Sequence, residues 1–467
     1  MNEKFDIAIL GGGPGGYVAA IRASQLGYKT VLIDKENLGG ICLNWGCIPT
    51  KSLLKNAEIY DLVKNKGKEF GITATGLKFD FNTIIKRSRN ISKKISSNVE
   101  MLIKKNKIKR IRGYGKLTSK TQLSVFGEKQ EEIEKIEADK IIISTGARSK
   151  TFNTIPIDRK MIITSKEAMI LPEQPKELII IGAGAIGIEF AYFYSVLGTK
   201  VIIIEMMDTI LPIEDHEVSA ALQRSFKKRG IDIFTGTKVD KAEIKGKNVN
   251  VTITKNEKQE VLSADKVLSA IGLIGNVEGF GLEKLGIVLF KNHIKVDKST
   301  YETNVKGIYA IGDVIGPPLL AHVASAEGIH CVEKMKGLNP PDIEYENIPG
   351  CTYCQPQVAS VGLTEKAAKE KGYEVKVGKF PFMASGKAFA VGEREGFVKF
   401  VFDEKYGELL GAHIIGSEAT ELIAEAVLAK SLEATGESII KTVHAHPTLS
   451  ESLMEAAAQT YGKAIHI

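Results

Sequence analysis

The sequence predicts an α/β protein in which two similar parallel-sheet units precede a C-terminal α+β domain. Three observations support this fold class. A short apolar strand, a glycine-rich turn and a helix follow one another at residues 5–26, and the same order recurs from Glu177. From Asn347 the pattern changes to turn-rich strands alternating with helices. At 467 residues the chain is also too long for one hydrophobic core, so several domains are expected.

The first unit has the arrangement that binds a dinucleotide. Residues 5–10 form an apolar strand, and Gly11-Gly12-Gly13-Pro14-Gly15-Gly16 opens a helix that extends to about Leu26. A second strand at residues 29–33 ends at Asp34. Glycines at these positions let the backbone approach a pyrophosphate, and the helix N-terminus favours its negative charge. Asp34 can accept hydrogen bonds from ribose hydroxyls.

The second unit repeats the first with the same spacing. A strand at residues 177–181 leads to Gly182-Ala183-Gly184-Ala185-Ile186-Gly187, and a strand at 200–204 leads to Glu205. In both units the acid lies 23 positions after the first glycine. Glycines used only for close helix–strand packing are the alternative, but the repeat with its terminal acid favours two bound dinucleotides. We therefore expect two Rossmann-like domains.

Later strands are expected to complete each sheet and so to set the domain boundaries. Residues 140–145 and 266–271 are apolar strands that stop at Gly146 and Gly272, and they are expected to return to the first and second sheets. A strand at 305–311 ends at Gly312-Asp313, where the acid can face a ligand in the crevice or simply occupy a surface turn. The predicted domains are residues 1–148 (completed by 273–346), 149–272 and 347–467.

Two cysteines near the N-terminus are candidates for a redox pair. Cys42 and Cys47 lie five positions apart within Gly-Gly-Ile-Cys-Leu-Asn-Trp-Gly-Cys-Ile-Pro-Thr-Lys-Ser, residues 39–52. In a regular helix that offset is a rise of about 7.5 Å, whereas a disulfide needs Cα atoms roughly 4.4–6.8 Å apart. The pair can bond only across a distorted turn, which Gly46 and Pro49 permit. A helix that starts or resumes at Pro49 would favour a thiolate at Cys47. Two unrelated thiols are the alternative.

The C-terminal region contains a candidate general base. Residues 444–451 read His-Ala-His-Pro-Thr-Leu-Ser-Glu. Thr448 followed by Glu451 matches a capping box at the start of a helix, which would account for Glu451 structurally. Alternatively, Glu451 orients the ring of His446 so that the imidazole can act as a general base. The spacing leaves both interpretations open.

Charge and composition restrict the possible partners. The formal net charge of +7 is a small excess of 63 basic over 56 acidic residues, which is not the concentrated charge of a nucleic-acid-binding protein. Basic residues gather only near residues 86–112, where they alternate with apolar residues in the pattern of an amphipathic helix. A solvated basic face is the favoured interpretation. A docking surface for an acidic partner is the alternative.

Other features exclude further classes of protein. The N-terminus lacks a basic n-region, and the most apolar span, residues 178–196, is interrupted by motif glycines and Glu189. We therefore expect neither a signal peptide nor a membrane span, and a cytoplasmic location. Five cysteines do not make a secreted disulfide framework in a chain of this length. Cys351-Thr-Tyr-Cys354 can be half a zinc site, but no second pair lies nearby, so no metal is expected.

These motifs occur together and in an order that resembles the pyridine nucleotide–disulfide oxidoreductases. The resemblance rests on the cysteine segment, the two dinucleotide units, Tyr309-Ala-Ile-Gly-Asp313 and the segment 444–451, and it extends from residue 5 to about 460. It implies FAD on the first domain, NAD on the second and dimerisation through the third. The implied FAD contacts are Gly11, Gly13, Gly16, Asp34, Lys51, Gly146, Asp313 and Ala321. The implied NAD contacts are Gly182, Gly184, Gly187, Glu189, Glu205 and Gly272.

The resemblance also implies a role for each catalytic residue. Cys47 lies next to the flavin, Cys42 exchanges with the substrate, and Lys51 pairs with Glu189. His446 and Glu451 complete the site of the other subunit in a homodimer. The motifs are most similar to those of family members that oxidise protein-bound dihydrolipoamide to lipoamide and reduce NAD⁺ to NADH. The implied partner is a lipoyl-bearing protein, either an acyltransferase subunit of a 2-oxo acid dehydrogenase complex or the carrier protein of glycine cleavage.

Alternative functions are less consistent with the residues. A glutathione-reductase-like enzyme would need a basic residue for NADP where Glu205 stands, and a mercuric-reductase-like enzyme would carry a C-terminal cysteine pair that this chain lacks. A non-catalytic binding subunit would not need Cys42, Cys47, His446 and Glu451 together. No Arg follows Glu205 at positions 206–208, which favours NAD over NADP.

Overall fold

The computed structural model describes residues 3–467 and divides into two compact units. Unit 1 comprises Met1–Leu53, Asn82–Lys150 and Gly272–Ile343. Unit 2 comprises Leu54–Phe81, Thr151–Ile271 and Glu344–Ile467. Met1 and Asn2, the first residues of the N-terminal segment considered above, lie outside the described residues. The three-domain division expected from the sequence stays a prediction.

Unit 1 is built on a mixed sheet whose central strands are parallel. The strand order is β3-β2-β1-β6-β5-β4, with β19 beside β6. The strand expected to return to the first sheet does so, because β6 pairs in parallel with β1 from Lys4↔Glu137 to Leu10↔Ile143. The bounds are β1 (Lys4–Leu10), β2 (Thr30–Asp34), β3 (Lys109–Arg112), β4 (Tyr114–Ser119), β5 (Gln122–Phe126), β6 (Glu132–Ile143) and β19 (Ile308–Ala310).

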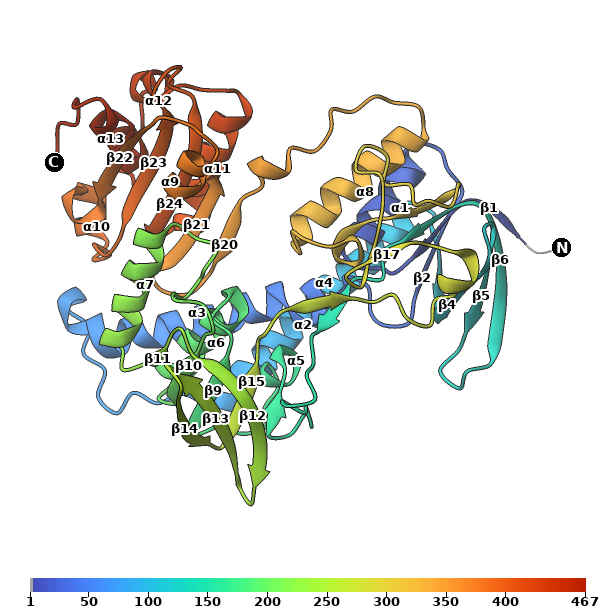
Figure 1. Ribbon diagram of the computed structural model, residues 1–467, viewed down its shortest axis with the longest axis horizontal. Helices are drawn as coiled ribbons and strands as arrows, with labels where there is room; N and C mark the ends of the chain where they lie inside the picture. Colours follow the sequence, from blue (N-terminus) through green and yellow to red (C-terminus); the bar gives the residue numbers. More distant parts are fainter. Residues whose placement is uncertain (1–2) are drawn as a thin grey trace. The chain divides into compact units, whose positions relative to one another are not determined.

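Two helices of unit 1 pack closely because glycines line their contact. Helix α1 (Pro14–Gln25) and helix α8 (Ala321–Met335) lie side by side in Figure 1. A Cβ on Gly328 of α8 would lie 2.7 Å from the carbonyl oxygen of Gly15 on α1. The contact therefore brings the start of α8, with the turn before it, to the same region as the glycine-rich turn that begins α1.

Helix α4 differs from the amphipathic helix expected over residues 86–112. It spans Phe81–Lys105, and the end of the basic stretch, Lys109–Arg112, forms strand β3 instead. Leu102 is one of the apolar residues in the basic stretch that a buried helix face would contain, but it is 44% exposed. The buried face is a line of mostly small side chains: Ile84, Ser88, Ser92, Ser96, Val99 and Ile103. Serines at every fourth position let the helix pack closely against the segment that carries the cysteine pair.

Unit 2 contains a second parallel sheet and an antiparallel ribbon. The parallel sheet has the order β11-β10-β9-β15-β8, and β15 pairs with β9 as the sequence predicts. The bounds are β8 (Ile162–Ile163), β9 (Glu177–Ile181), β10 (Lys200–Ile204), β11 (Asp232–Phe234) and β15 (Lys266–Ser269). Helices α6 (Ala185–Val196) and α7 (His216–Lys228) belong to this part, and the ribbon comprises β12 (Lys238–Lys245), β13 (Asn248–Lys255) and β14 (Lys258–Ala264).

The C-terminal part of unit 2 has the α+β character that the sequence predicts. An antiparallel sheet with the order β20-β21-β24-β23-β22 is packed by helices α11 (Ala419–Ser431) and α13 (Glu451–Thr460) (Figure 1). All residues of the central strands β23 (Phe397–Asp403) and β24 (Leu409–Gly416) are buried. The other strands are β20 (Gly350–Thr352), β21 (Gln357–Gly362) and β22 (Val375–Pro381).

A fully buried lysine joins helix α7 to this antiparallel sheet. Lys399 on β23 is 0% exposed, and its Nζ lies 3.0 Å from Asp215, 2.8 Å from Glu217 and 2.9 Å from Glu365. Asp215 is the N-cap of α7, so the cluster fixes the start of that helix. Burial would raise the pKa of Glu217, but Lys379 and Lys399 outweigh it and lower the pKa to about 2.

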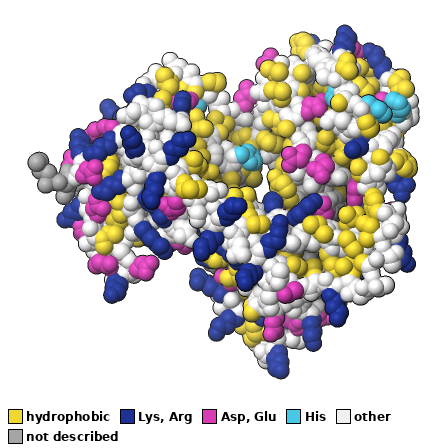
Figure 2. All heavy atoms as spheres, turned by 180° about the vertical axis from the view of Figure 1, so that it is seen from behind, with side chains coloured by type: hydrophobic (Ala, Val, Ile, Leu, Met, Phe, Trp, Pro, Cys, Tyr) yellow, Lys and Arg dark blue, Asp and Glu magenta, His cyan; other side chains and the backbone are white. Residues whose placement is uncertain are grey.

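Charges of both signs are interspersed on the surface. On the face seen in Figure 2, Lys and Arg side chains alternate with Asp and Glu side chains, as the small excess of basic residues suggests. Within residues 3–467, no helix has both the length and the apolar character needed to cross a bilayer.

We predict that Lys399→Met destabilises the protein by about 3–5 kcal/mol, because it leaves Asp215 buried without a counter-charge. Lys379→Met is the control, since the side chain of Lys379 is 43% exposed; its loss should cost at most about 1 kcal/mol. Thermal and urea unfolding measure both. The wild type should also lose stability as the pH falls from 4.5 toward 2, because folded Glu217 binds its proton later than the unfolded chain does. Equal stability of the two variants would contradict this account.

Candidate functional site

The three glycines of the first G-x-G-x-x-G pattern, Gly11, Gly13 and Gly16, differ in how much room they leave for a side chain. A Cβ on Gly11, whose φ is +106°, would lie 2.1 Å from the carbonyl oxygen of Ser144. A Cβ on Gly16 would lie 1.8 Å from the carbonyl oxygen of Gly11. A Cβ on Gly13, in contrast, would meet nothing closer than 3.9 Å. Close packing therefore explains the first and third glycines but not the middle one.

The second motif repeats this pattern in unit 2. A Cβ on Gly182 would lie 2.5 Å from the carbonyl oxygen of Ala270, and one on Gly187 would lie 2.0 Å from that of Gly182. A Cβ on Gly184 would have no neighbour within 4 Å. Each middle glycine is the N-cap of the following helix, Gly13 for α1 and Gly184 for α6. Open space in front of a helix N-terminus is what a bound pyrophosphate requires.

The acid at the end of each unit is held by the glycine turn. Both carboxylate oxygens of Asp34 accept hydrogen bonds from backbone N–H groups, one from Gly12 and the other from Glu36. Glu205 accepts from Ala183 at 2.7 Å and from Met207 at 2.8 Å. Burial raises the pKa of Asp34, while the two N–H groups partly oppose this rise. The matching contacts fix each carboxylate beside its turn, where its remaining lone pairs can accept ribose hydroxyls.

Asp313 lies at the carboxyl edge of the first sheet, in the turn between β19 and α8. Burial and, second, the charge of Glu327 raise its pKa to about 6. Glu327 accepts the backbone N–H of Gly312 at 2.7 Å and so fixes the turn that carries Asp313. No sequence motif indicates this role of Glu327. The available signal was an isolated acidic residue within the apolar part of a helix. Ala321 is the first residue of α8.

The cysteine pair spans a break between two helices. Helix α2 (Gly40–Trp45) ends before Gly46, whose φ of −149° and ψ of −113° lie outside the helical region, and helix α3 (Cys47–Asp61) follows. The sequence raised the possibility that a helix starts or resumes at Pro49. Helix α3 instead begins two residues earlier, at Cys47, because Gly46 breaks the preceding helix. The carbonyl of Gly46 accepts the backbone N–H of Thr50 at 3.1 Å, which closes the first turn of α3.

The two thiols interact and share their charge unequally. Both cysteines are in the thiol form and partly buried. A hydrogen bond with Cys47 and burial raise the pKa of Cys42 far above its ordinary value, and the Lys51 ammonium only partly offsets this. Cys47 stands at the N-terminus of α3, which favours a thiolate there. In the reduced pair, the raised pKa of Cys42 and the helix N-terminus at Cys47 both favour Cys47 as the position of a thiolate.

His446 and Glu451 form a pair in unit 2. His446 Nδ1 lies 2.8 Å from Glu451 Oε1, and the His446 side chain is 78% exposed. Because an ionised carboxylate can only accept, Nδ1 carries the proton and the exposed Nε2 has a free lone pair. Burial would raise the pKa of Glu451, but the Thr448 N–H and His446 lower it overall. This arrangement is that of an oriented general base.

The capping-box interpretation of this segment is only half correct. Glu451 Oε2 accepts the backbone N–H of Thr448 at 2.8 Å, which is one half of a capping box. The Thr448 hydroxyl, however, donates to the carbonyl of Ala445 at 2.7 Å, and helix α13 begins at Glu451 with Ser450 as its N-cap. Glu451 therefore serves the turn and the imidazole at once.

The predicted residues are divided between the two units. Unit 1 holds the first glycine motif, Asp34, both cysteines, Lys51, Gly146, Gly272, Asp313 and Ala321. Unit 2 holds the second glycine motif, Glu189, Glu205, His446 and Glu451. Within unit 2, Glu189 is buried on α6 and accepts the backbone N–H of Tyr353 at 3.0 Å. Its pairing with Lys51 stays a prediction.

The two thiols of the segment Cys351–Cys354 differ in burial. Cys354 is buried and donates to the carbonyl of Pro356 at 3.1 Å, while Cys351 is partly buried. Among residues 3–467, no group of three or more His, Cys, Asp or Glu side chains is arranged to hold a metal ion. Between the two cysteines, the backbone N–H of Tyr353 donates to Glu189.

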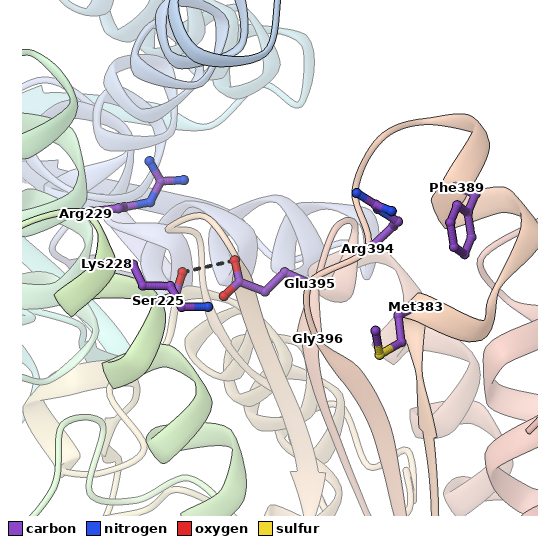
Figure 3. A pocket seen from close by; sticks show the side chains of 8 residues that line it. All are labelled: Ser225, Lys228, Arg229, Met383, Phe389, Arg394, Glu395 and Gly396. Atoms are coloured by element: carbon purple, nitrogen blue, oxygen red, sulfur yellow. Dashed lines mark hydrogen bonds between the residues drawn. The ribbon is translucent and has the colours of Figure 1, made fainter. Parts of the chain in front are cut away.

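An open pocket of about 710 Å³ in unit 2 is separate from these residues. It lies between the end of α7 and residues 383–396, and Figure 3 shows Lys228 and Arg229 on one side and Met383 and Phe389 on the other. Ser225 donates to Glu395 at 3.1 Å across its floor. Arg229 is neutralised by Asp61 at 2.8 Å. None of the predicted site residues lines this pocket.

Comparison with known proteins identifies relatives along the whole chain. The family model for pyridine nucleotide-disulphide oxidoreductases matches residues 5–328, and the model for their dimerisation domain matches residues 348–457. Curated dihydrolipoyl dehydrogenases of Rhizobium etli and Zymomonas mobilis are 47% and 48% identical, each covering 100% of both chains. The crystal structure of LpdA from Mycobacterium tuberculosis superposes with a TM-score of 0.90 at 27% identity, over 97% of this chain and 98% of that one.

The crowding around the glycines predicts different effects for two alanine substitutions. Gly13→Ala should preserve the fold but lose most of the FAD that the first domain is expected to bind, because the methyl group enters the open space. Gly16→Ala should destabilise the protein by about 1–3 kcal/mol or more, because its Cβ cannot fit against Gly11. Flavin absorbance per chain and thermal unfolding distinguish these effects. Wild-type flavin content in Gly13→Ala would contradict the assignment of the open space.

Proposed function

The chain belongs to the pyridine nucleotide–disulphide oxidoreductases, and on that premise we propose that it is a dihydrolipoyl dehydrogenase. It oxidises protein-bound dihydrolipoamide to lipoamide and reduces NAD⁺ to NADH. The observation that carries the proposal is the Cys42–Cys47 pair, whose thiols are hydrogen-bonded across the break at Gly46. Relatives at 47% and 48% identity that carry this name support it.

Each step at the cysteine pair follows from the chemistry of the residues present. His446 Nε2 takes a proton from a thiol of dihydrolipoamide, and the resulting thiolate attacks the Cys42 sulfur of the oxidised pair. The Cys42–Cys47 bond breaks, and Cys47 leaves as a thiolate, which the N-terminus of α3 stabilises. The second lipoyl sulfur then attacks its neighbour in the mixed disulfide, so lipoamide forms and Cys42 is released as a thiol. Two electrons have passed to the pair.

The residues around the first glycine motif fit FAD. Gly13 leaves open space at the N-terminus of α1 for the pyrophosphate, and Asp34 has lone pairs for the adenosine ribose. Bound FAD supplies two-electron chemistry between the cysteine pair and NAD⁺. Lys51, Gly146, Asp313 and Ala321 are proposed to line the remainder of the FAD site. The turn that carries Asp313 is held by Glu327, which orients the acid before a ligand arrives.

Glu205 is proposed to select NAD over NADP. Its carboxylate is 9% exposed and fixed by two backbone N–H groups, so it cannot swing away from a 2′-phosphate. Met206 and Met207 follow it and are 69% and 51% exposed, so no cation adjoins the acid in sequence. The carboxylate repels the 2′-phosphate of NADP and accepts hydrogen bonds from both ribose hydroxyls of NAD, and both effects favour NAD.

A homodimer and a lipoyl-bearing partner complete the proposal. The match to the dimerisation domain covers His446 and Glu451, and the exposed Nε2 of His446 is free to enter a site on another subunit. The lipoyl group is proposed to arrive on an acyltransferase subunit or a glycine cleavage carrier protein. We infer a cytoplasmic location from the metabolic role of such carriers.

One assay tests the function against its alternatives. Purified yellow protein is given dihydrolipoamide with NAD⁺ or NADP⁺, and separately glutathione disulfide or Hg²⁺ with NADPH. We expect NADH formation with a kcat/KM for NAD⁺ at least about tenfold above that for NADP⁺, since a repelled phosphate costs more than about 1.4 kcal/mol. NADPH oxidation by glutathione disulfide or Hg²⁺ without NADH formation would replace the proposal with a reductase function.

We predict that His446→Ala lowers turnover with dihydrolipoamide by about 10²–10⁴-fold through loss of the general base. Thermal stability should change little, because the Thr448 N–H still binds Glu451. His216→Ala is the matched control, since the side chain of His216 is 80% exposed on α7. A near-normal rate for His446→Ala would leave Glu451 with only its role in the turn.

A further inference from the structure

Helix α4 fastens the backbone on both sides of the cysteine pair. The Ser96 hydroxyl donates to the carbonyl of Leu38 at 2.7 Å, before the pair, and the Ser88 hydroxyl donates to that of Pro49 at 3.0 Å, after it. Both serines are buried, so these hydrogen bonds are shielded from water. Helix α4 therefore binds both ends of residues 38–49, the segment called the redox turn below.

Arg89, on the same helix, holds the middle of the turn. Its Nη1 donates to the carbonyl of Asn44 at 2.6 Å, and its guanidinium carbon lies 4.2 Å from the centre of the Trp45 ring. Only four residues separate the two cysteines, and Arg89 contacts two of them. A carbonyl in the last turn of α2 has no partner within that helix, so a cation there is favoured.

Asn44 passes this restraint to the preceding loop. Its side-chain amide donates to the carbonyls of Leu38 at 3.1 Å and Gly40 at 3.0 Å, and the residue is 6% exposed. Arg89 therefore holds the Asn44 backbone carbonyl, while the carbonyls of Leu38 and Gly40 hold its side-chain amide. Cys42 lies between these anchor points, so its position relative to Cys47 depends on the Asn44 carbonyl staying in place.

We propose that Arg89 is a positioning residue for the redox pair, holding Cys42 against Cys47 through Asn44 and Trp45. This inference deepens the proposed function, because it concerns the same disulfide. A held turn raises the effective concentration of one thiol beside the other and so favours the closed disulfide. It also keeps the hydrogen bond between the two sulfurs, which determines which cysteine carries the charge. Arg suits this role better than Lys because its plane stacks on an indole while its edge donates.

The test measures the equilibrium of the pair with dithiothreitol. Holoenzyme is equilibrated in mixtures of reduced and oxidised dithiothreitol without air, alkylated, and analysed by mass for peptides containing Cys42 and Cys47. In this exchange the Cys42–Cys47 bond breaks as the cyclic disulfide of dithiothreitol forms. Two electrons pass to the cysteines, Cys42 takes up one proton, and the second proton is released to the buffer where Cys47 is a thiolate. Arg89→Met should weaken the protein disulfide about tenfold through loss of one charged hydrogen bond, which corresponds to a potential about 30 mV less negative.

Thiol reactivity gives a second readout that a purely structural role would not move. In the wild type, the hydrogen bond with Cys47 and burial raise the pKa of Cys42, so we expect its alkylation by iodoacetamide to increase with pH. In Arg89→Met the looser turn should lower that pKa, and alkylation of Cys42 should begin at lower pH. Arg89→Lys, which keeps a donor but not the stacking plane, should be intermediate in both measurements.

Two comparisons decide the proposal. Lys94→Met, an exposed position on the same helix, should behave as wild type. Trp45→Leu combined with Arg89→Met should weaken the disulfide by less than the product of the single effects, because both act through one contact. A wild-type equilibrium in folded Arg89→Met and Arg89→Lys, or fully additive effects, would overturn the role of Arg89. If the Arg89 variants show these shifts but the wild type does not oxidise dihydrolipoamide, the proposed substrate is refuted and the positioning role of Arg89 stands.

Discussion

A close approach of two backbone segments inside each glycine motif is the constraint on which the rest of the structure depends. The carbonyl oxygen of Gly11 occupies the place that a side chain on Gly16 would need, and Gly182 and Gly187 repeat this contact. Because neither contact tolerates a Cβ, strand, turn and helix pack in only one way. The middle glycine then faces open space at the helix N-terminus. A site for a pyrophosphate is thus a consequence of backbone packing.

The redox turn depends on a second backbone feature, the break at Gly46. Without it, Cys42 and Cys47 would lie on one continuous helix, too far apart to bond. With it, Cys47 begins a new helix and gains the favourable field of its N-terminus, while Cys42 remains in a short helix whose last carbonyls have no partner within that helix. The same break therefore brings the sulfurs together and makes them chemically unequal. Arg89 then donates to the Asn44 carbonyl, which has no hydrogen-bond donor within so short a helix.

Several features needed long-range contacts that sequence patterns do not contain. The basic segment was expected to bury its apolar residues. Helix α4 does bury Val99 and Ile103, but it exposes Leu102 and also buries a row of serines, Ser88, Ser92 and Ser96. Periodicity identifies a helix but cannot show that its neighbour is a turn whose carbonyls need hydroxyl donors. The cluster at Lys399 was likewise invisible, since Asp215 and Glu365 lie far from it in sequence. The start of α3 was misplaced by two residues because Pro49 is a strong helix-start signal and Cys47 is a weak one.

The sequence by itself determined the fold class, the two dinucleotide units with their terminal acids, and the cysteine pair, because these rest on local rules of backbone conformation and residue spacing. It left Glu451 open between a helix cap and a partner of His446. Only the tertiary structure decided that question, by placing one carboxylate oxygen on Thr448 and the other on the imidazole. It also decided which glycines are crowded and which face open space. Such distinctions depend on distances between segments remote in sequence, which local patterns cannot supply.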